Sequence, residues 1–169
     1  MNETIAESML EPTPINPLRT DPSANPSAAL GSAASQSAPL SASQRAERSL
    51  HIALTAARIA AENRGRNVAV LDMRELTPVF DYFVIATGTS RRQLHAMSEE
   101  IDNVLEKDLG DRRLGIEGYR ESRWIVLDYG DVVIHLFDEE TREYYSLEQL
   151  WSQAKPVPLP EWRLATSSE

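Results

Sequence analysis

The sequence predicts a small α+β or α/β sandwich built on one mixed sheet. Three observations support this fold class. Short runs rich in Val and Ile alternate with two long stretches in which apolar residues recur every three or four positions. A tight glycine turn between two short runs is typical of an antiparallel hairpin. The 169-residue chain has no cysteine, which excludes disulfides, thiolate metal sites and a cysteine nucleophile.

Composition divides the chain into one predicted domain, residues 45–155, and two tails. Residues 1–44 hold six of the ten prolines, are rich in Ser and Ala, and contain no aromatic residue. Such a stretch buries too little apolar surface to offset the entropy of ordering, so we expect a disordered extension. Three prolines at alternate positions likewise predict a flexible tail over residues 156–169.

The N-terminal extension shows no targeting signal. It has neither the basic start and apolar core of a secretory signal nor the Arg-rich, acid-poor composition of a transit peptide. We therefore expect a cytoplasmic protein. No apolar run approaches the ~20 residues that a membrane-spanning helix requires, so we expect no membrane contact.

Two long helices are predicted from helical spacing of apolar residues. The first covers residues 44–64, with Ser43 as the N-cap and Gly65 as the glycine that ends it. The second covers residues 90–109 and stops at Gly110. The apolar strip of the first helix is narrow and rich in Ala, so we expect this helix to pack closely on a sheet.

Four strands are predicted from short apolar runs of β-branched and aromatic residues. They cover residues 67–73, 81–87, 123–129 and 131–137. Gly130 separates the last two runs, so they form an antiparallel hairpin.

Two further segments complete the predicted domain. The segment Gly115–Gly118 is a loop or a brief edge strand. Residues 138–151 are helical, in one piece or in two short pieces, and their acidic first turn suits a helix N-terminus.

Charge is negative overall and unevenly distributed. The chain has 26 acidic residues against 17 Lys and Arg, a net charge of -9. Residues 45–66 carry five Arg and two Glu, whereas residues 128–148 carry seven acids and one Arg. A firm grip on a phosphate backbone needs clustered basic residues, so we expect little direct contact with nucleic acid and a basic partner instead.

The turn Thr87–Ser90, between a strand and a helix, is the first candidate for chemistry. Small residues at this place offer free backbone N–H groups to an anion. Nucleotidyltransferases use a similar turn, but they need two carboxylates on a following strand to hold magnesium, and no Asp-x-Asp follows here. A Walker-type phosphate loop is also absent. We interpret the turn as a helix N-cap in which Ser90 or Thr89 satisfies backbone amides.

The other titratable residues form no catalytic set. Asp128 and Asp131 are a carboxylate pair of the kind used in acid–base chemistry, but they flank a predicted hairpin turn, where Asp is favoured for its geometry. His51, His95 and His135 lie one to an element, and no Ser–His–Asp arrangement is visible from spacing. We therefore expect a protein that is not an enzyme, with no catalytic residue, metal or cofactor.

Trp124 is the first candidate for binding a partner. A tryptophan at the start of a strand is either a core residue, since Trp is highly buried on average, or a partly exposed anchor. Trp, Tyr and Arg dominate binding hot spots. Arg142, Tyr144, Tyr145 and Trp151 bring the same composition to the end of the domain, where the alternative is a helix that packs its aromatics on the sheet.

Four blocks, in order and with matching spacing, resemble the Iojap-type ribosomal silencing factors. The blocks are Asp81–Ser90 with the helix after it, Gly115–Gly118, Trp124–His135 and Tyr144–Trp151. The resemblance covers about residues 46–152, nearly the whole predicted domain. It leaves the N-terminal extension outside the family's pattern.

This resemblance implies a fold and a function that composition does not show. The fold would be similar to a nucleotidyltransferase domain without its catalytic carboxylates. The protein would bind the large ribosomal subunit at ribosomal protein uL14, block joining of the small subunit, and repress translation in starvation or stationary phase. Self-association into dimers is also implied.

The implied function requires a surface that binds the ribosomal protein and a domain large enough to obstruct the small subunit. It requires no catalytic chemistry. An acidic patch suits a basic ribosomal protein, because complementary charge speeds encounter and makes binding sensitive to salt. By analogy with the family, the residues expected to bind the ribosomal protein are Glu117, Gly118, Trp124, Asp128, Asp138, Arg142 and Tyr145. In this hypothesis Trp124 is the apolar anchor, and Arg142 and Tyr145 frame or support the patch.

Two other functions compete with this hypothesis. The first is a divergent nucleotidyltransferase-like enzyme that binds a nucleotide at the turn Thr87–Ser90. The second is a binding module for a different basic protein.

Overall fold

The structure is a computed structural model that describes residues 39–160. Within this range it contains one six-stranded sheet and four helices, which confirms the mixed α/β fold class. No helix in the described range has the length and apolar character to cross a membrane. In chain order the elements are α1 (Ala42–Glu62), β1 (Arg66–Asp72), β2 (Tyr82–Thr87), α2 (Arg91–Leu109), β3 (Gly115–Glu117), β4 (Trp124–Asp128), β5 (Val132–Phe137), α3 (Glu139–Tyr145), α4 (Leu147–Leu150) and β6 (Lys155–Pro156).

The sheet has the strand order β3-β4-β5-β2-β1-β6. Only β2 and β5 pair in parallel, from Tyr82 opposite Val132 to Thr87 opposite Phe137, and the other pairs are antiparallel. The predicted mixed sheet and the β4–β5 hairpin are therefore confirmed. Gly130 turns the hairpin with φ +81°, a conformation that glycine adopts at little cost.

Helix α1 begins and ends earlier in the sequence than predicted. Its N-cap and its C-cap each lie two residues before the predicted position. Ser41, and not Ser43, is the N-cap, because its side chain forms a reciprocal capping box with Gln44. The C-cap is Asn63 instead of Gly65. Glycine is needed at 65 for a different reason, since a Cβ there would lie 2.6 Å from the carbonyl oxygen of Ala60.

The caps of α2 agree with the sequence. Ser90 accepts a hydrogen bond from the backbone N–H of Gln93, and Gly110 ends the helix in the left-handed conformation. The last helical segment forms two pieces, α3 and α4, because Ser146 takes a left-handed conformation between them.

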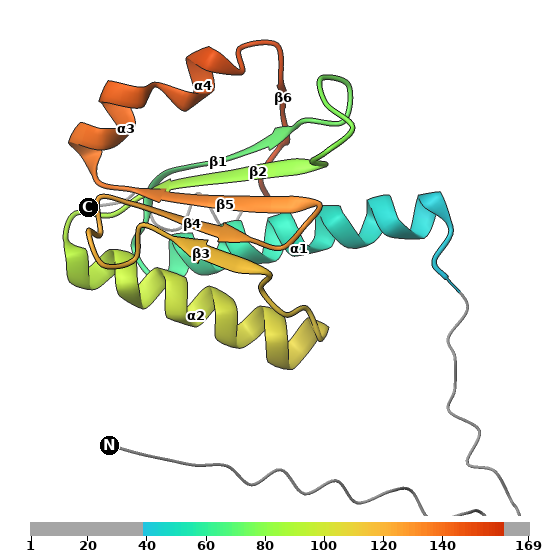
Figure 1. Cartoon of the computed structure of the whole chain (residues 1–169), viewed down its shortest axis with the longest axis horizontal. Coiled ribbons are helices and arrows are strands. Elements are labelled where there is room, and N and C mark those ends of the chain that lie inside the picture. The colour runs from blue at the N-terminus through green and yellow to red at the C-terminus, as the bar shows by residue number, and fades with distance from the viewer. Residues whose placement is uncertain (1–38, 161–169) are drawn as a thin grey trace, which may run out of the picture. The chain divides into compact units, whose positions relative to one another are not determined.

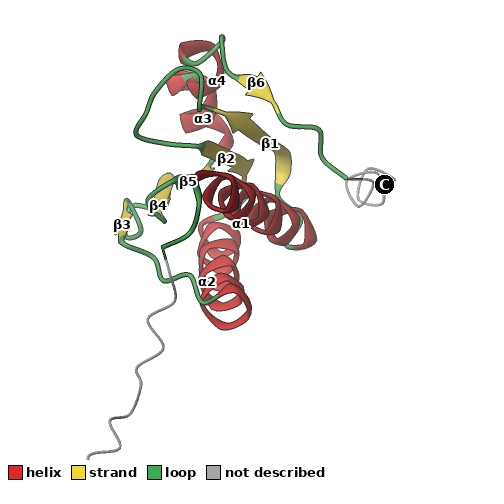
Figure 2. Cartoon of the chain, turned by 90° about the vertical axis from the view of Figure 1, so that its right-hand side faces the viewer, coloured by secondary structure: helices red, strands yellow, loops and turns green. Residues whose placement is uncertain are grey.

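The sheet lies between two unequal layers of helix. Figures 1 and 2 show α1 and α2 together against one face, and α3 with α4 on the other. The large core between the sheet and α1–α2 includes Ile59, Val84, Met97, Ile101, Ile125 and Leu127. A smaller core on the opposite face includes Leu71, Met73, Phe83, Ile85, Val133, Phe137 and Leu147.

The sheet continues into the segment that was predicted to be a tail. Pro156 of β6 pairs with Leu71 of β1, and the N–H of Val157 donates to the carbonyl oxygen of Val70 at 2.8 Å. Proline is compatible with this place because β6 is an edge strand. The sequence pattern did not predict this strand, because alternating prolines are more typical of linkers.

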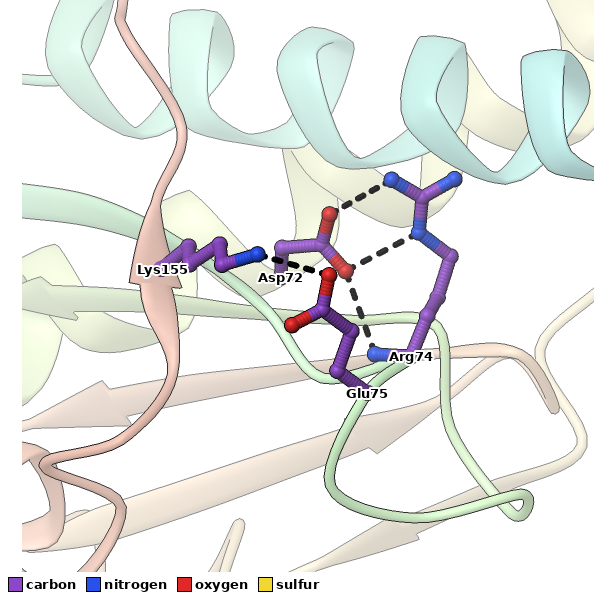
Figure 3. Close-up of polar contacts among 4 residues, drawn as sticks. All are labelled: Asp72, Arg74, Glu75 and Lys155. Atoms are coloured by element: carbon purple, nitrogen blue, oxygen red, sulfur yellow. Dashed lines mark hydrogen bonds and ion pairs between the residues drawn. The ribbon is translucent and has the colours of Figure 1, made fainter.

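An ion pair helps to anchor β6. Lys155 Nζ lies 2.6 Å from Glu75 Oε1, and Asp72 pairs with Arg74 close by (Figure 3). The hydrogen bond from Arg74 holds the pKa of the Asp72 carboxyl below its ordinary value, against the effect of burial. The fold therefore continues past the predicted boundary at 155, at least to Leu159, which packs against the large core. Residues 161–169 lie outside the described range.

The N-terminal boundary also shifts. Residues 42–44, predicted to end the disordered extension, already belong to α1. The rest of that prediction, residues 1–38, falls outside the described residues.

Candidate functional site

Five residues at the β3 end of the sheet share the face that α1 and α2 leave free. Opposite residues of an antiparallel pair share a face, and β3 pairs Gly115 with Asp128 and Glu117 with Val126. Their neighbours along the strands, Ile116, Ile125 and Leu127, pack toward the helices. We call the outward set the β3–β4 face: Gly115, Glu117, Trp124, Val126 and Asp128.

Trp124 is partly exposed, as the second of the two sequence alternatives expected, although its ring also packs in the small core. Its ring stacks on Phe137, with centroids 4.8 Å apart, and lies 4.9 Å from the ring of Tyr145. Its indole Nε1–H donates to Nδ1 of His135 at 3.3 Å. The side chain is half-buried, so one edge is fixed in the small core while the other lines the surface.

His135 supports Trp124 from below and is 7% exposed. Burial lowers the pKa of its imidazole to about 4, against a small opposing effect of Glu148. The ring is therefore neutral near pH 7, and because Nδ1 accepts from Trp124, the proton lies on Nε2. Nε2 has no hydrogen-bond partner among the described residues. This arrangement orients an indole and supplies no proton near neutral pH.

A groove of about 430 Å³ runs beside Trp124, between the β3–β4 loop and α3. Tyr144 and Tyr145 form its α3 side and are 81% and 52% exposed. Large exposed aromatic side chains placed together are typical of protein-binding surfaces. The groove is lined by Gly118, Glu121, Arg123, Trp124, Glu140, Thr141, Tyr144 and Tyr145.

Gly118 sets the close approach of the loop to β4. It has φ +70°, and a Cβ at this position would lie 1.9 Å from the carbonyl oxygen of Trp124. Any side chain would therefore push the loop away from the tryptophan. Glycine is therefore required at 118 for the position of the loop, and its role in a binding site stays a prediction.

Charged side chains rim the groove and are partly neutralised. Arg123 Nε lies 3.0 Å from Asp138 Oδ2, and its Nη2 lies 2.6 Å from Glu140 Oε2. Asp138 also caps α3 by accepting from the N–H of Thr141 at 2.7 Å. Burial acts to raise the pKa of Asp138, but the hydrogen bonds from Thr141 and Arg123 outweigh it and leave the pKa lowered. Asp138 is therefore an anion that organises the start of α3.

The structure brings some of the predicted site residues together and separates others. Gly118, Trp124 and Tyr145 line the groove, with Asp138 at its rim. Glu117 lies beside Val126 on the β3–β4 face and is exposed.

Asp128 and Arg142 lie apart from the groove. Asp128 shares the face of Trp124 but sits four residues along the strand, about 13 Å away at ~3.3 Å per residue. Its Oδ1 accepts from the N–H of Gly130 at 2.7 Å, which agrees with a role in the turn. Arg142 is half-buried, donates to Thr87 Oγ1 at 2.8 Å and pairs with Glu148. Arg142 therefore ties α3 and α4 to the end of β2 instead of facing outward.

The side-chain hydroxyl groups of the turn Thr87–Ser90 are all hydrogen-bonded. Thr89 donates through its backbone N–H to Gln93 Oε1 at 2.7 Å, Ser90 caps α2, and Thr87 is buried against Arg142. These contacts agree with the interpretation as a helix N-cap.

One serine and one histidine meet in a way that spacing did not reveal. His95 Nε2 lies 2.6 Å from Ser122 Oγ, and the His95 ring stacks on Tyr119. Ser122 is 1% exposed and has φ +55°, and its hydroxyl also bonds to the carbonyl oxygen of Tyr119. The pair therefore braces the β3–β4 loop. Within residues 39–160, no three His, Asp or Glu side chains are placed to hold a metal ion.

Sequence reasoning missed three features of this surface. Alternation along β4 would have placed Val126 between Trp124 and Asp128 on one face. The bond between Trp124 and His135 has no local signal, because it joins two strands. The high exposure of Tyr144 depends on the phase of a seven-residue helix, which its sequence does not fix.

Residues 46–169 match the protein family described as "Ribosomal silencing factor during starvation". Ribosomal silencing factor RsfS of Bacillus subtilis is 39% identical over 93 residues, which cover 55% of this chain and 78% of that protein. A mouse protein named mitochondrial assembly of ribosomal large subunit protein 1 is also 39% identical over 93 residues, 54% of this chain and 41% of its own length.

A solved structure shows the same fold. The crystal structure of a Chromobacterium violaceum protein is 33% identical and has a TM-score of 0.59, and the match covers 64% of this chain and 89% of that one.

Proposed function

The chain belongs to the ribosomal silencing factor family, and we propose that it binds the large ribosomal subunit through ribosomal protein uL14 and blocks joining of the small subunit. This would repress translation when nutrients are limiting or in stationary phase. The proposed role belongs to the cytoplasm, where subunits join, and requires no catalytic chemistry. The name of the mouse relative, which refers to the large subunit, supports the choice of subunit.

The observation that carries this proposal is the aromatic groove beside the β3–β4 face. Trp124 is held firmly on one edge by Phe137 and His135, while Tyr144 and Tyr145 extend its apolar surface outward. Rigid aromatic side chains lose little entropy on binding, which makes them effective anchors. A domain of this size can supply the ~800 Å² that a standard interface buries on each partner.

Carboxylates surround the anchor and fit a basic partner. Glu121 and Glu140 line the groove and are exposed, and Glu117 and Asp128 lie along the β3–β4 face. Ribosomal proteins are mostly basic, so the two potentials are complementary. Under this proposal Glu117 and Asp128 meet Lys or Arg, and Arg142 supports α3 from behind.

Dimer formation stays a prediction under the same proposal. One surface cannot hold uL14 and a second copy at once. A dimer that also binds the ribosome must therefore use a surface other than the groove.

Sucrose-gradient sedimentation tests the proposal directly. Purified full-length protein is mixed with separated large subunits, small subunits are then added, and the gradient is run at low and raised salt. We expect the protein to migrate with large subunits and to reduce joined ribosomes, with weaker binding at raised salt. A folded protein that does not migrate with large subunits at low salt would overturn the ribosomal function.

A matched pair of variants locates the site. Tyr144→Ala removes an anchor that is 81% exposed, so we expect little loss of stability and about a tenfold weaker affinity for large subunits. Leu150→Ala removes a 72% exposed apolar side chain on α4, outside the groove, and should bind as the wild type does. Trp124→Ala is a less clean test, because the ring also packs on Phe137. Equal affinities of the two variants for large subunits would show that the binding site is not the groove.

Competition separates uL14 from another basic client. Isolated uL14 should displace the protein from large subunits in the same gradient. Binding that persists against excess uL14 would point to a different partner on the ribosome.

A further inference from the structure

Within residues 39–160, five of the six arginines that take part in no ion pair gather at one end of the domain. Residues 39–160 contain fifteen Lys and Arg side chains, and eight of them pair with a carboxylate. Five of the other seven form what we call the arginine end: Arg64, Arg66, Arg91, Arg92 and Arg120.

Contacts between elements hold the first members of this set together. Gln93, in the first turn of α2, donates through Nε2 to the carbonyl oxygen of Arg64 at 2.8 Å. Arg66 begins β1 and is the register partner of Thr87, the last residue of β2 before the turn into α2. Figure 1 shows the end of α1 and the start of α2 at the same end of the helix layer.

The set also reaches the loop that borders the groove. Arg91 donates through Nη2 to the carbonyl oxygen of Arg120 at 2.6 Å. Arg120 lies in the β3–β4 loop between Gly118 and Glu121, which both line the groove. All five arginines are exposed, and Arg120 places the arginine end next to the proposed protein-binding site.

We propose that the arginine end binds the phosphate backbone of structured RNA. All five side chains are guanidinium groups, which form paired hydrogen bonds to phosphate oxygens. The N-terminus of the 19-residue helix α2 lies among them and favours negative charge. The set is spread over three separate stretches of chain, which suits an extended polyanion better than a small ion. The choice of RNA rests on the proposed function, since RNA is the polyanion of a ribosomal subunit.

A membrane surface fits the arginine end less well. Proteins that lie on membranes insert large apolar side chains beside their basic residues. Within residues 39–160, the exposed large apolar residues Leu40, Val79, Leu114 and Leu150 lie in other segments, and Tyr144 and Tyr145 belong to the adjoining groove and not to the arginine end itself.

The overall charge of -9 hides this surface, because a net charge averages over the whole chain. The expectation of little nucleic-acid contact came from that average. On a protein that is acidic elsewhere, one basic end orients the approach to an RNA surface and limits binding to one side.

The test measures binding of the full-length protein to a fluorescent 20-base-pair RNA hairpin by anisotropy, between 50 and 200 mM KCl. We expect a Kd of roughly 10⁻⁶ to 10⁻⁴ M that weakens steeply with salt. In Arg64→Gln/Arg92→Gln, affinity should fall on the order of tenfold, and the slope of log K against log salt should fall by about two. Arg66→Gln/Arg120→Gln provides a second, independent pair with the same expectation.

The matched control is Arg45→Gln/Lys107→Gln. It removes the same two charges from unpaired residues at the opposite end of α1 and α2, where Arg48 donates to the carbonyl oxygen of Leu109. We expect this control to bind the hairpin as the wild type does. Equal losses in the control and in the arginine-end variants would overturn the proposal, as would a wild type that does not bind the hairpin at 50 mM KCl.

Two further results keep this inference separate from the proposed function. Wild-type protein that migrates with large subunits but ignores the hairpin would overturn the RNA-binding surface alone. Protein that binds the hairpin but not large subunits would overturn the ribosomal function alone. Binding to vesicles of phosphatidylcholine and phosphatidylglycerol, without binding to the hairpin, would assign the arginine end to a membrane instead.

Discussion

Helices α1 and α2 close one face of the sheet, whereas the opposite face is covered unevenly by α3, α4 and loops. On the closed face, Ile125 and Leu127 of β4 are fully buried. On the opposite face, the neighbouring Trp124 and Val126 are only half-buried, and β5 places an imidazole, His135, in the small core. Apart from tyrosines, His135 is the one titratable side chain that is buried within residues 39–160.

The two faces therefore differ in how completely they are packed. The closed face is filled by buried apolar side chains that pack against α1 and α2. The opposite face keeps features that cost stability, namely half-exposed aromatic rings and a buried imidazole with an unpartnered nitrogen. Such features are expected where a surface is retained for binding a partner.

The largest expected effect is a difference in stability between alanine variants of Ile125 and Val126, which are neighbours on β4 and point to opposite faces of the sheet. Ile125→Ala should lower the free energy of unfolding by 2–5 kcal/mol, because it leaves a cavity under α1 and α2. Val126→Ala should cost about 1 kcal/mol, since its side chain is already half-exposed. Urea unfolding of both variants measures the difference. Equal costs would mean that the second face is as closed as the first.

The next effect concerns pH and uses the buried imidazole. The pKa of His135 is lowered by burial to about 4, whereas an unfolded chain has 6.5. The unfolded state therefore binds a proton more readily. The contribution of His135 to the free energy of unfolding should be fully present above pH 6.5 and should decline as the pH falls toward 4. Below pH 4, up to about 3 kcal/mol of the free energy of unfolding should be lost. Protonation of Nδ1 would also break the bond from Trp124, so tryptophan fluorescence reports the same change.

His135→Gln is the control for this pH dependence. Gln keeps a polar side chain that can accept from Trp124 but does not titrate in this range. Between pH 6.5 and 4 the free energy of unfolding should fall more gently in the variant than in the wild type. Parallel curves would show that other groups cause the dependence.

The smallest expected effect tests the turn at the end of the closed face. Because Thr89 and Ser90 are engaged by Gln93, ATP or CTP with magnesium should shift the melting temperature no more than pyrophosphate with magnesium does. A specific nucleotide site would stabilise the fold by about 2.7 kcal/mol at a hundredfold excess over its Kd. A clear shift with one nucleotide alone would revive the enzyme hypothesis.

Much of the fold could be predicted from the sequence, because most of its elements have local signals. The period of the apolar residues predicts both long helices, and the glycine turn at 130 predicts the β4–β5 hairpin. The boundary residues are harder, as the caps of α1 show. A capping box between Ser41 and Gln44 outweighs the equally suitable Ser43.

The candidate site could be predicted only in part. Trp124 and Gly118 stand out by residue type, whereas their grouping with Tyr144 depends on how α3 packs across the sheet. The sequence left open whether Arg142 frames or supports the patch, because only tertiary packing places its guanidinium against Glu148 and Thr87. Strand β6 has only two residues and is held by pairing with a distant strand, so no local pattern could indicate it.

The parallel pairing of β2 with β5 also has a consequence during synthesis. Tyr82 pairs with Val132, so 50 residues separate the two partners at the centre of the sheet. At ~5–20 residues per second, the edge of β2 waits about 3–10 s for its neighbour to be translated. The nascent chain thus carries a strand with one unpaired edge, whose residues are all buried in the finished fold, while it is still attached to a ribosome. Chaperones that act at the exit tunnel therefore have a defined interval in which to protect it.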